Sequence, residues 1–282
     1  MRPGWQIDLK WVAGIFACVA IVASGILFSL AEITERGRAE PLSTAFVAFL
    51  IDGRVTDEEF EAVQAQAAAD PSGLVSLSPL DLDVRGSQIA GLDKEATSLL
   101  LAGEFATVLY EGGSETAEAL ILEPRPNEDG ERQEAIELGP TGSLTADQYS
   151  TFRTFFLVSL AIVIALLGLV AFLSRGLGRL GAPAVVLALS TAPLAALWAL
   201  AATAVGTPGE DEAFYAVIAR QLVHDTAVDL RGFFVAVLSV ALAWVVIAFV
   251  GTLLTPLSRK LGRKLATLAA RTPQPEAPGP AA

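Results

Sequence analysis

The chain has 282 residues, of which 53% are hydrophobic and only 18% are charged, and its mean hydropathy is +0.54. Soluble domains carry roughly 25% charged residues, so this composition argues against an ordinary soluble enzyme. The formal net charge of -12 argues against nucleic acid as a partner. With one cysteine, Cys18, and one histidine, His224, the chain cannot form an internal disulfide or a Cys/His zinc cluster.

Four long apolar runs contain no Asp, Glu, Lys, Arg or His. A helix rises about 1.5 Å per residue, so about 20 apolar residues cross a hydrocarbon core roughly 30 Å thick. We therefore predict an α-helical integral membrane protein with four transmembrane helices and a small α+β extracytoplasmic domain inserted between the first and second helices. The predicted helices are Trp11 to Ala31 (11-31), Thr154 to Ser174 (154-174), Pro183 to Val205 (183-205) and Phe233 to Thr255 (233-255).

The first apolar run has two alternative interpretations, a cleaved signal peptide and lipidation at Cys18. A signal peptide has an apolar region of about 7 to 15 residues. The run is longer than that, and Phe16 stands where a lipoprotein signal has a small residue. We therefore favour an uncleaved anchor over cleavage, and cleavage over lipidation.

Charge in the connecting segments predicts the orientation, because short loops rich in Lys and Arg stay in the cytoplasm. Segments 1-10, 175-182 and 256-282 are net basic. Residues 32 to 151, in contrast, contain 24 acidic and 7 basic residues, and segment 206-232 contains 5 acidic and 2 basic residues. We expect both termini inside, with an acidic domain (32-153) and an acidic loop (206-232) outside. Because the chain has 15 Arg, 4 Lys and one Asn, a composition typical of GC-rich bacterial genomes, we expect a multi-pass protein of the bacterial inner membrane.

The outer region contains several local structure signals. Pro41 to Ile51 has helical apolar spacing, and Thr56 and Glu59 form a capping box for a helix to about Ala69. Asp93 caps a further helix, for which Gly112-Gly113 is a stop signal. Alternation from Leu80 to Val84 predicts a strand, and a hairpin is plausible for 119–122 and 135–138. A second capping box, Thr145 with Gln148, predicts that the second span begins outside the membrane.

Two flanking segments have amphipathic patterns. In the small outer loop, an apolar face is opposite acidic residues, and its composition favours docking on protein over docking on lipid; this face consists of Phe214, Val217, Ile218 and Leu222. After the last span, a basic stretch is suited to anionic lipid headgroups through Arg259, Lys260, Arg263 and Lys264. The Pro- and Ala-rich segment from Thr272 to Ala282 is predicted to be a disordered tail.

Candidate catalytic and metal-binding patterns are weak. An EF-hand alignment over Asn127, Asp129 and Gly130 places Arg125 and Ile136 at ligand positions, so a solvated acidic surface is the better interpretation. His224 lies beside Asp225, but no nucleophile is nearby in sequence. We predict no catalytic residue, metal or cofactor, and no enzyme.

The third span contains the one polar motif at membrane depth that we consider a site, Ser190, Thr191 and Pro193. A proline frees a helical carbonyl, and a kinked helix can line a cavity. Our leading expectation is a non-catalytic subunit, assembly factor or sensor whose outer domain binds another envelope protein. The alternative is a channel or transporter component with a cavity near Pro193. Expected partners are membrane lipids and either another envelope protein or a second copy of the chain.

Overall fold

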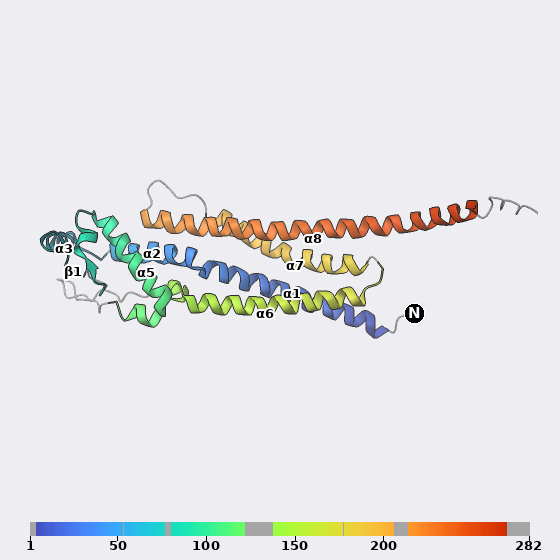
Figure 1. Ribbon diagram of the computed structural model, residues 1–282, viewed down its shortest axis with the longest axis horizontal. Coiled ribbons are helices and arrows are strands. Elements are labelled where there is room, and N and C mark those ends of the chain that lie inside the picture. Colours follow the sequence, from blue (N-terminus) through green and yellow to red (C-terminus); the bar gives the residue numbers. More distant parts are fainter. Residues whose placement is uncertain are drawn as a thin grey trace, which may run out of the picture.

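The computed structural model describes residues 4–52, 54–76, 80–121, 138–176, 178–205 and 214–269. Four of its helices are long and apolar enough to cross a membrane (Figure 1): α1 (Gly4–Thr34), α6 (Ala146–Leu173), α7 (Gly178–Val205) and α8 (Phe214–Ala269). Their candidate spans are Leu9–Thr34, Ala146–Leu173, Gly178–Val205 and Val217–Leu254. These spans fit a multi-pass helical membrane protein, as the apolar runs predicted.

The four helices form a bundle in which α1 packs against α6 and α7, and α7 packs against α8. Small residues fill the contacts, since Ala17 and Ala241 are fully buried. Large apolar side chains point outward instead, with Phe172 76% and Leu200 68% exposed. This arrangement is expected in lipid, because bilayer tails are as apolar as leucine and close helix contact depends on small residues.

Polar and aromatic contacts also join the bundle helices. The Ser24 and Ser159 hydroxyls are hydrogen bonded at 2.6 Å, which links α1 to α6. The indole of Trp198 on α7 donates to the Ser29 hydroxyl on α1 at 3.2 Å. A cluster of phenylalanines at the same level joins α1, α6 and α8 and consists of Phe28, Phe156, Phe233 and Phe234.

The described residues from Arg36 to Leu144 form a second unit at one end of the bundle, which we call the outer module after its predicted side (Figure 1). Its elements are α2 (Arg36–Asp52), α3 (Asp57–Ala69), β1 (Leu74–Val75), β2 (Val84–Arg85), α4 (Gly86–Ile89), α5 (Lys94–Glu118) and the 3-10 helix η1 (Gly139–Ser143). Its core contains Ile51, Leu80, Leu101, Phe105 and Leu109, each at most 1% exposed. Burial of each such side chain stabilises the folded state by about 1.5–3 kcal/mol, so this core can hold the module together.

The predicted N-terminal caps of α3, α5 and α6 are present. Thr56 and Glu59 form the predicted capping box of α3, and the Asp93 carboxylate accepts the Ala96 amide at 2.7 Å to cap α5. Thr145 caps α6 through the Gln148 amide at 3.3 Å.

The strand signals and one stop signal were only partly right. β1 and β2 are an antiparallel pair of two residues each, and Leu80 forms an isolated bridge with Ile121. The hairpin predicted over 119–122 and 135–138 falls mostly outside the described residues, so the α+β character of the module is not confirmed. Gly113 (φ 81°, ψ 173°) kinks α5 where a stop was predicted, and the helix resumes to Glu118 because glycine adopts positive φ without strain.

Helix α8 joins three segments that the sequence suggested separately. Its 56 residues include the amphipathic stretch of the outer loop, the fourth span and the basic stretch that follows. At one end it lies beside α2 of the outer module, and at the other it extends past the bundle (Figure 1). The predicted disordered tail lies outside the described residues.

Candidate functional site

The hydroxyls of the predicted intramembrane polar motif form hydrogen bonds within their own helix. Ser190 and Thr191 are buried, and their hydroxyls donate to the carbonyls of Val186 at 2.7 Å and Leu187 at 2.8 Å. These are the usual bonds from residue i to residue i−4 within a helix. Pro193 is exposed on the surface of α7. The hydroxyls therefore bond within their own helix, and the carbonyl freed by Pro193, that of Leu189, is not their acceptor.

The predicted outer docking face lies against the outer module. Ile218 borders a cavity of about 360 Å³ with residues of α2 and α5, including Thr44 and Gly103. Leu222 borders a pocket of about 90 Å³ with Leu42 of α2 and Trp198 of α7. Val217 is half-buried, and the side chain of Phe214 lies outside the described part of the chain. Ile218 and Leu222 thus lie beside α2 of the outer module.

An ion pair crosses the same contact. The guanidinium of Arg38 on α2 lies 3.3 Å from the Asp229 carboxylate on α8 and 3.4 Å from the Glu32 carboxylate on α1. The chain enters α2 from α1 through a bend at Glu35, so Arg38 is held at the point where three helices meet. We call this meeting point of α1, α2 and α8 the outer joint.

A second arginine fastens the outer joint to α5. Arg36 lies 2.9 Å from Glu40 and 3.0 Å from Glu111, and its guanidinium is 5.9 Å from the centre of the Tyr110 ring. The hydrogen bond to Glu40 raises the pKa of Arg36 above its ordinary value. Burial raises the pKa of the Tyr110 phenol, so both groups keep their charge state across the physiological range. Exposed ion pairs contribute about 0–1 kcal/mol each, so these contacts orient α2 more than they stabilise it.

His224 forms no catalytic pair with its sequence neighbour. The Nδ1 atom of His224 is buried and has no hydrogen-bond partner among the described residues. The carboxylate of Asp225 accepts instead from the Gln221 side-chain amide at 2.9 Å, one turn earlier on α8.

The remaining sequence candidates are the acidic metal-binding patterns and the basic stretch after the last span. Within the described ranges, no group of three or more His, Cys, Asp or Glu side chains is placed to hold a metal ion. The segment aligned with an EF-hand lies outside those ranges. The backbone of α8 includes Arg259, Lys260, Arg263 and Lys264, but their side chains are not described.

The outer joint was not predicted from the sequence. Arg38 and Asp229 are 191 positions apart, and a single charge beside a span gives no sign of its partner. Comparisons of the chain with protein-family models, with curated proteins and with solved structures found no match.

Proposed function

We propose that this chain is a non-catalytic membrane protein whose outer module binds another envelope protein, as a subunit, an assembly factor or a sensor. The observation that supports this most is the outer joint, where α2 of the module packs along α8 and is paired with it through Arg38 and Asp229. The proposal includes the bacterial inner membrane as location, with both termini cytoplasmic, because the basic segments precede the first span and follow the last.

The outer joint connects the outer module directly to helix α8, in addition to its chain connections to α1 and α6. A module attached only through a flexible linker would move independently of the spans. Here the chain enters the module through the end of α1, leaves it through the start of α6, and is held from the side by α8. A partner that shifts α2 would therefore shift α8, which continues through the bundle to Ala269. This connection suits a sensor or an assembly factor.

The described surface of the module indicates what kind of partner would fit. Exposed carboxylates that form no described ion pair include Glu58, Glu61, Asp81 and Asp83. Large apolar side chains are also exposed, with Phe49 52% and Leu74 59% accessible. Complementary charge steers association, and apolar anchors supply affinity. We expect a partner with a basic surface and an apolar pocket.

Affinity purification of the full-length protein from its native membranes in mild detergent tests the proposal. We expect a protein to co-purify in stoichiometric amount, and to be lost from a variant with Glu58→Lys and Glu61→Lys. The matched control, Phe172→Ala, changes only a lipid-facing side chain and should retain the partner. Recovery of the protein without any stoichiometric companion, or equal capture by all three proteins, would contradict the proposal.

The alternative of a channel or transporter component gains no support from the described geometry. Its proposed residues, Ser190 and Thr191, have their hydroxyls bonded inside α7, and Pro193 lies on the outer surface of that helix. A cavity near Pro193 stays a prediction, which solute flux in proteoliposomes would test.

A further inference from the structure

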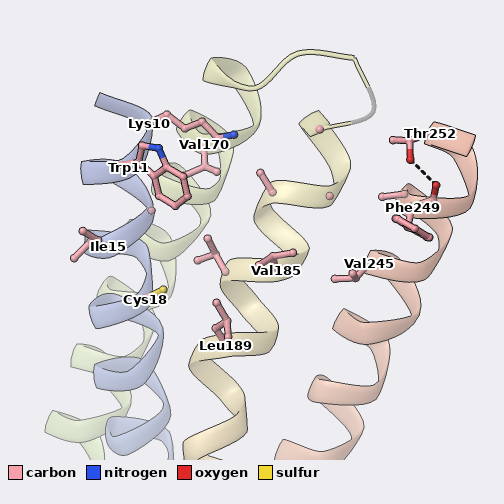
Figure 2. A pocket seen from close by; sticks show the side chains of 16 residues that line it. Lys10, Trp11, Ile15, Cys18, Val170, Val185, Leu189, Val245, Phe249 and Thr252 are labelled. Atoms are coloured by element: carbon pink, nitrogen blue, oxygen red, sulfur yellow. Dashed lines mark hydrogen bonds between the residues drawn. The ribbon is translucent and has the colours of Figure 1, made fainter. Parts of the chain in front are cut away.

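A groove of about 540 Å³ lies between α1, α7 and α8 near the end of the bundle where the chain begins (Figure 2). Its walls are almost entirely carbon, with Ile15 from α1, Leu189 from α7 and Phe249 from α8. These three side chains are 63%, 67% and 63% exposed, so the groove is open at the side of the bundle. The outer joint and its pockets lie at the other end of α8 and share no residue with it.

Glycines create the groove. Gly14, Gly178 and Gly181 line it, and a Cβ atom added at Gly178 would meet nothing within 4 Å. At Gly14 the nearest atom would be a Val186 methyl at 3.9 Å. Gly25, farther along α1, differs because a Cβ there would lie 2.3 Å from the Leu194 side chain. At Gly181 an added Cβ would lie 3.3 Å from the Cβ of Ala248 on α8. The absence of side chains thus allows close helix contact at Gly25 and Gly181 and leaves open space at Gly14 and Gly178.

The position of the groove determines what can fill it. Cys18, Leu189 and Val245 line it and belong to candidate membrane spans. An apolar space offers water too few hydrogen-bond partners, so water would not occupy it stably. The bundle is surrounded by lipid, and the groove volume falls within the roughly 300–1,000 Å³ of small-molecule sites. A single hydrocarbon chain suits this space better than the helix of another protein.

One end of the groove carries a positive charge. Lys10 lies across that end beside Trp11, where the apolar walls stop (Figure 2). Its ammonium group has no ion pair with any residue that the structure describes. Lys10 is the second residue of the candidate span that starts at Leu9, so it belongs at headgroup level, where lysine and tryptophan are favoured.

We propose that this groove binds one acyl chain of an anionic phospholipid, whose phosphate faces Lys10. The apolar walls hold the chain, and the ammonium group selects the headgroup charge. The site lies on α8, α7 and α1 together, so a bound chain holds these helices at a fixed separation. This inference does not depend on the proposed function of the outer module.

Native mass spectrometry of the detergent-purified protein, mixed with equal amounts of phosphatidylglycerol and phosphatidylcholine, tests the proposal. We expect one phosphatidylglycerol to be retained per chain. Gly14→Leu fills the groove and should lower this retention at least about tenfold, whereas Gly168→Leu, on an exposed face of α6, should not. Lys10→Gln should lower the preference for phosphatidylglycerol about fivefold, the usual effect of one lysine near a membrane surface. Arg175→Gln removes a charge outside the groove and should leave the preference for phosphatidylglycerol unchanged.

Equal lipid retention by wild type, Gly14→Leu and Gly168→Leu would overturn the proposal. So would a wild-type dimer that Gly14→Leu dissociates without any loss of lipid, because the groove would then bind a second copy of the chain. If Gly14→Leu fails to fold, the wild type decides the question through a phosphatidylglycerol with a photoreactive acyl chain. Cross-links concentrated at Val185 and Leu189 would support the site, and cross-links spread evenly over the lipid-facing residues would contradict it.

Discussion

The outer module and the membrane bundle place their large apolar side chains in opposite ways. In the module, Phe105 is fully buried at the centre of a core. In the bundle, Phe172 is 76% exposed, and the most buried positions are alanines such as Ala17 and Ala241. The same residue type thus lies inside one region and outside the other.

The surrounding solvent explains this difference. Water drives apolar surface inward, at about 25 cal/mol per Å² removed from contact with it. Lipid exerts no such force between helices, so the bundle depends on close backbone contact and on a few hydrogen bonds. It follows that substitutions of the same kind should have different effects in the two regions.

The largest difference is expected for phenylalanine. Replacing Phe105 with Ala leaves a cavity in the module core and should lower the free energy of unfolding by about 3–5 kcal/mol. Phe172→Ala removes a side chain that faces lipid and should change the free energy of unfolding by less than about 0.5 kcal/mol. Pulse proteolysis of the full-length protein in detergent measures both. Equal losses would show that the module has no core of its own.

Glycine substitutions sharpen the comparison with a smaller effect. A Cβ at Gly86 would lie 2.7 Å from the carbonyl oxygen of Asp70 and 3.1 Å from the backbone of Ala67, so Gly86→Ala must displace backbone. We expect a loss of about 1–3 kcal/mol. A Cβ at Gly168 would meet nothing within 4 Å, and Gly168→Ala should be neutral or slightly stabilising. Thermal unfolding of the two variants checks this; a neutral Gly86→Ala would refute the close packing of α3 on α4.

A hydrogen bond between two bundle helices should contribute less to the free energy of unfolding than these glycine contacts. A double-mutant cycle of Ser24→Ala and Ser159→Ala should give a coupling energy of about 0.6 kcal/mol, the average for such pairs in membrane helices. Steric trapping in lipid bicelles measures it. A coupling energy of zero would mean that α1 and α6 are held by packing alone.

The smallest expected change in stability comes from the turn that begins at Asp70, and it depends on pH. The Asp70 carboxylate accepts from the Ser72 hydroxyl at 2.8 Å and the Gly73 amide at 3.0 Å, and these bonds lower its pKa below the ordinary 3.8. A lowered pKa favours the ionised form in the folded state, so the stabilisation is complete above pH 3.8 and declines as the pH falls through the lower, folded value.

Asp70→Asn should therefore be less stable than wild type at pH 7, with a difference that shrinks in acid. Melting temperatures between pH 7 and pH 3 measure this difference. Asp83→Asn makes the same substitution at another exposed carboxylate of the module and is the control. A constant difference for Asp70→Asn across the range would refute the role of the ionised carboxylate.

The spans and the caps were predictable because their signals are local. A run of apolar residues fixes the length of a spanning helix, and the Thr56 and Glu59 pair satisfies amides within a single turn. The alternation from Leu80 to Val84 was a weaker signal. A strand is stabilised by pairing with a neighbour, and β2 pairs only with the two residues of β1, so the regular strand is shorter than the alternation predicted.

The outer joint could not be predicted because it depends on residues distant in sequence. Gly206 to Gly232 was treated as a loop with a separate helix, yet the described part of it, from Phe214, continues without interruption into the fourth span. Helical spacing identified the apolar face of this segment but not the surface that it covers. Only the folded chain shows that Leu222 and Asp229 lie against α2.

The outer joint should hold the outer module and the adjoining end of α8 together as one rigid unit. Electron spin resonance can measure the distance between labels at Glu58→Cys on α3 and Gln221→Cys on α8, both exposed positions, in a chain with Cys18→Ser. The outer joint predicts a single narrow distance distribution in lipid nanodiscs. A broad distribution would show that the module is flexibly tethered. It would contradict the proposal that a partner bound to the module shifts α8.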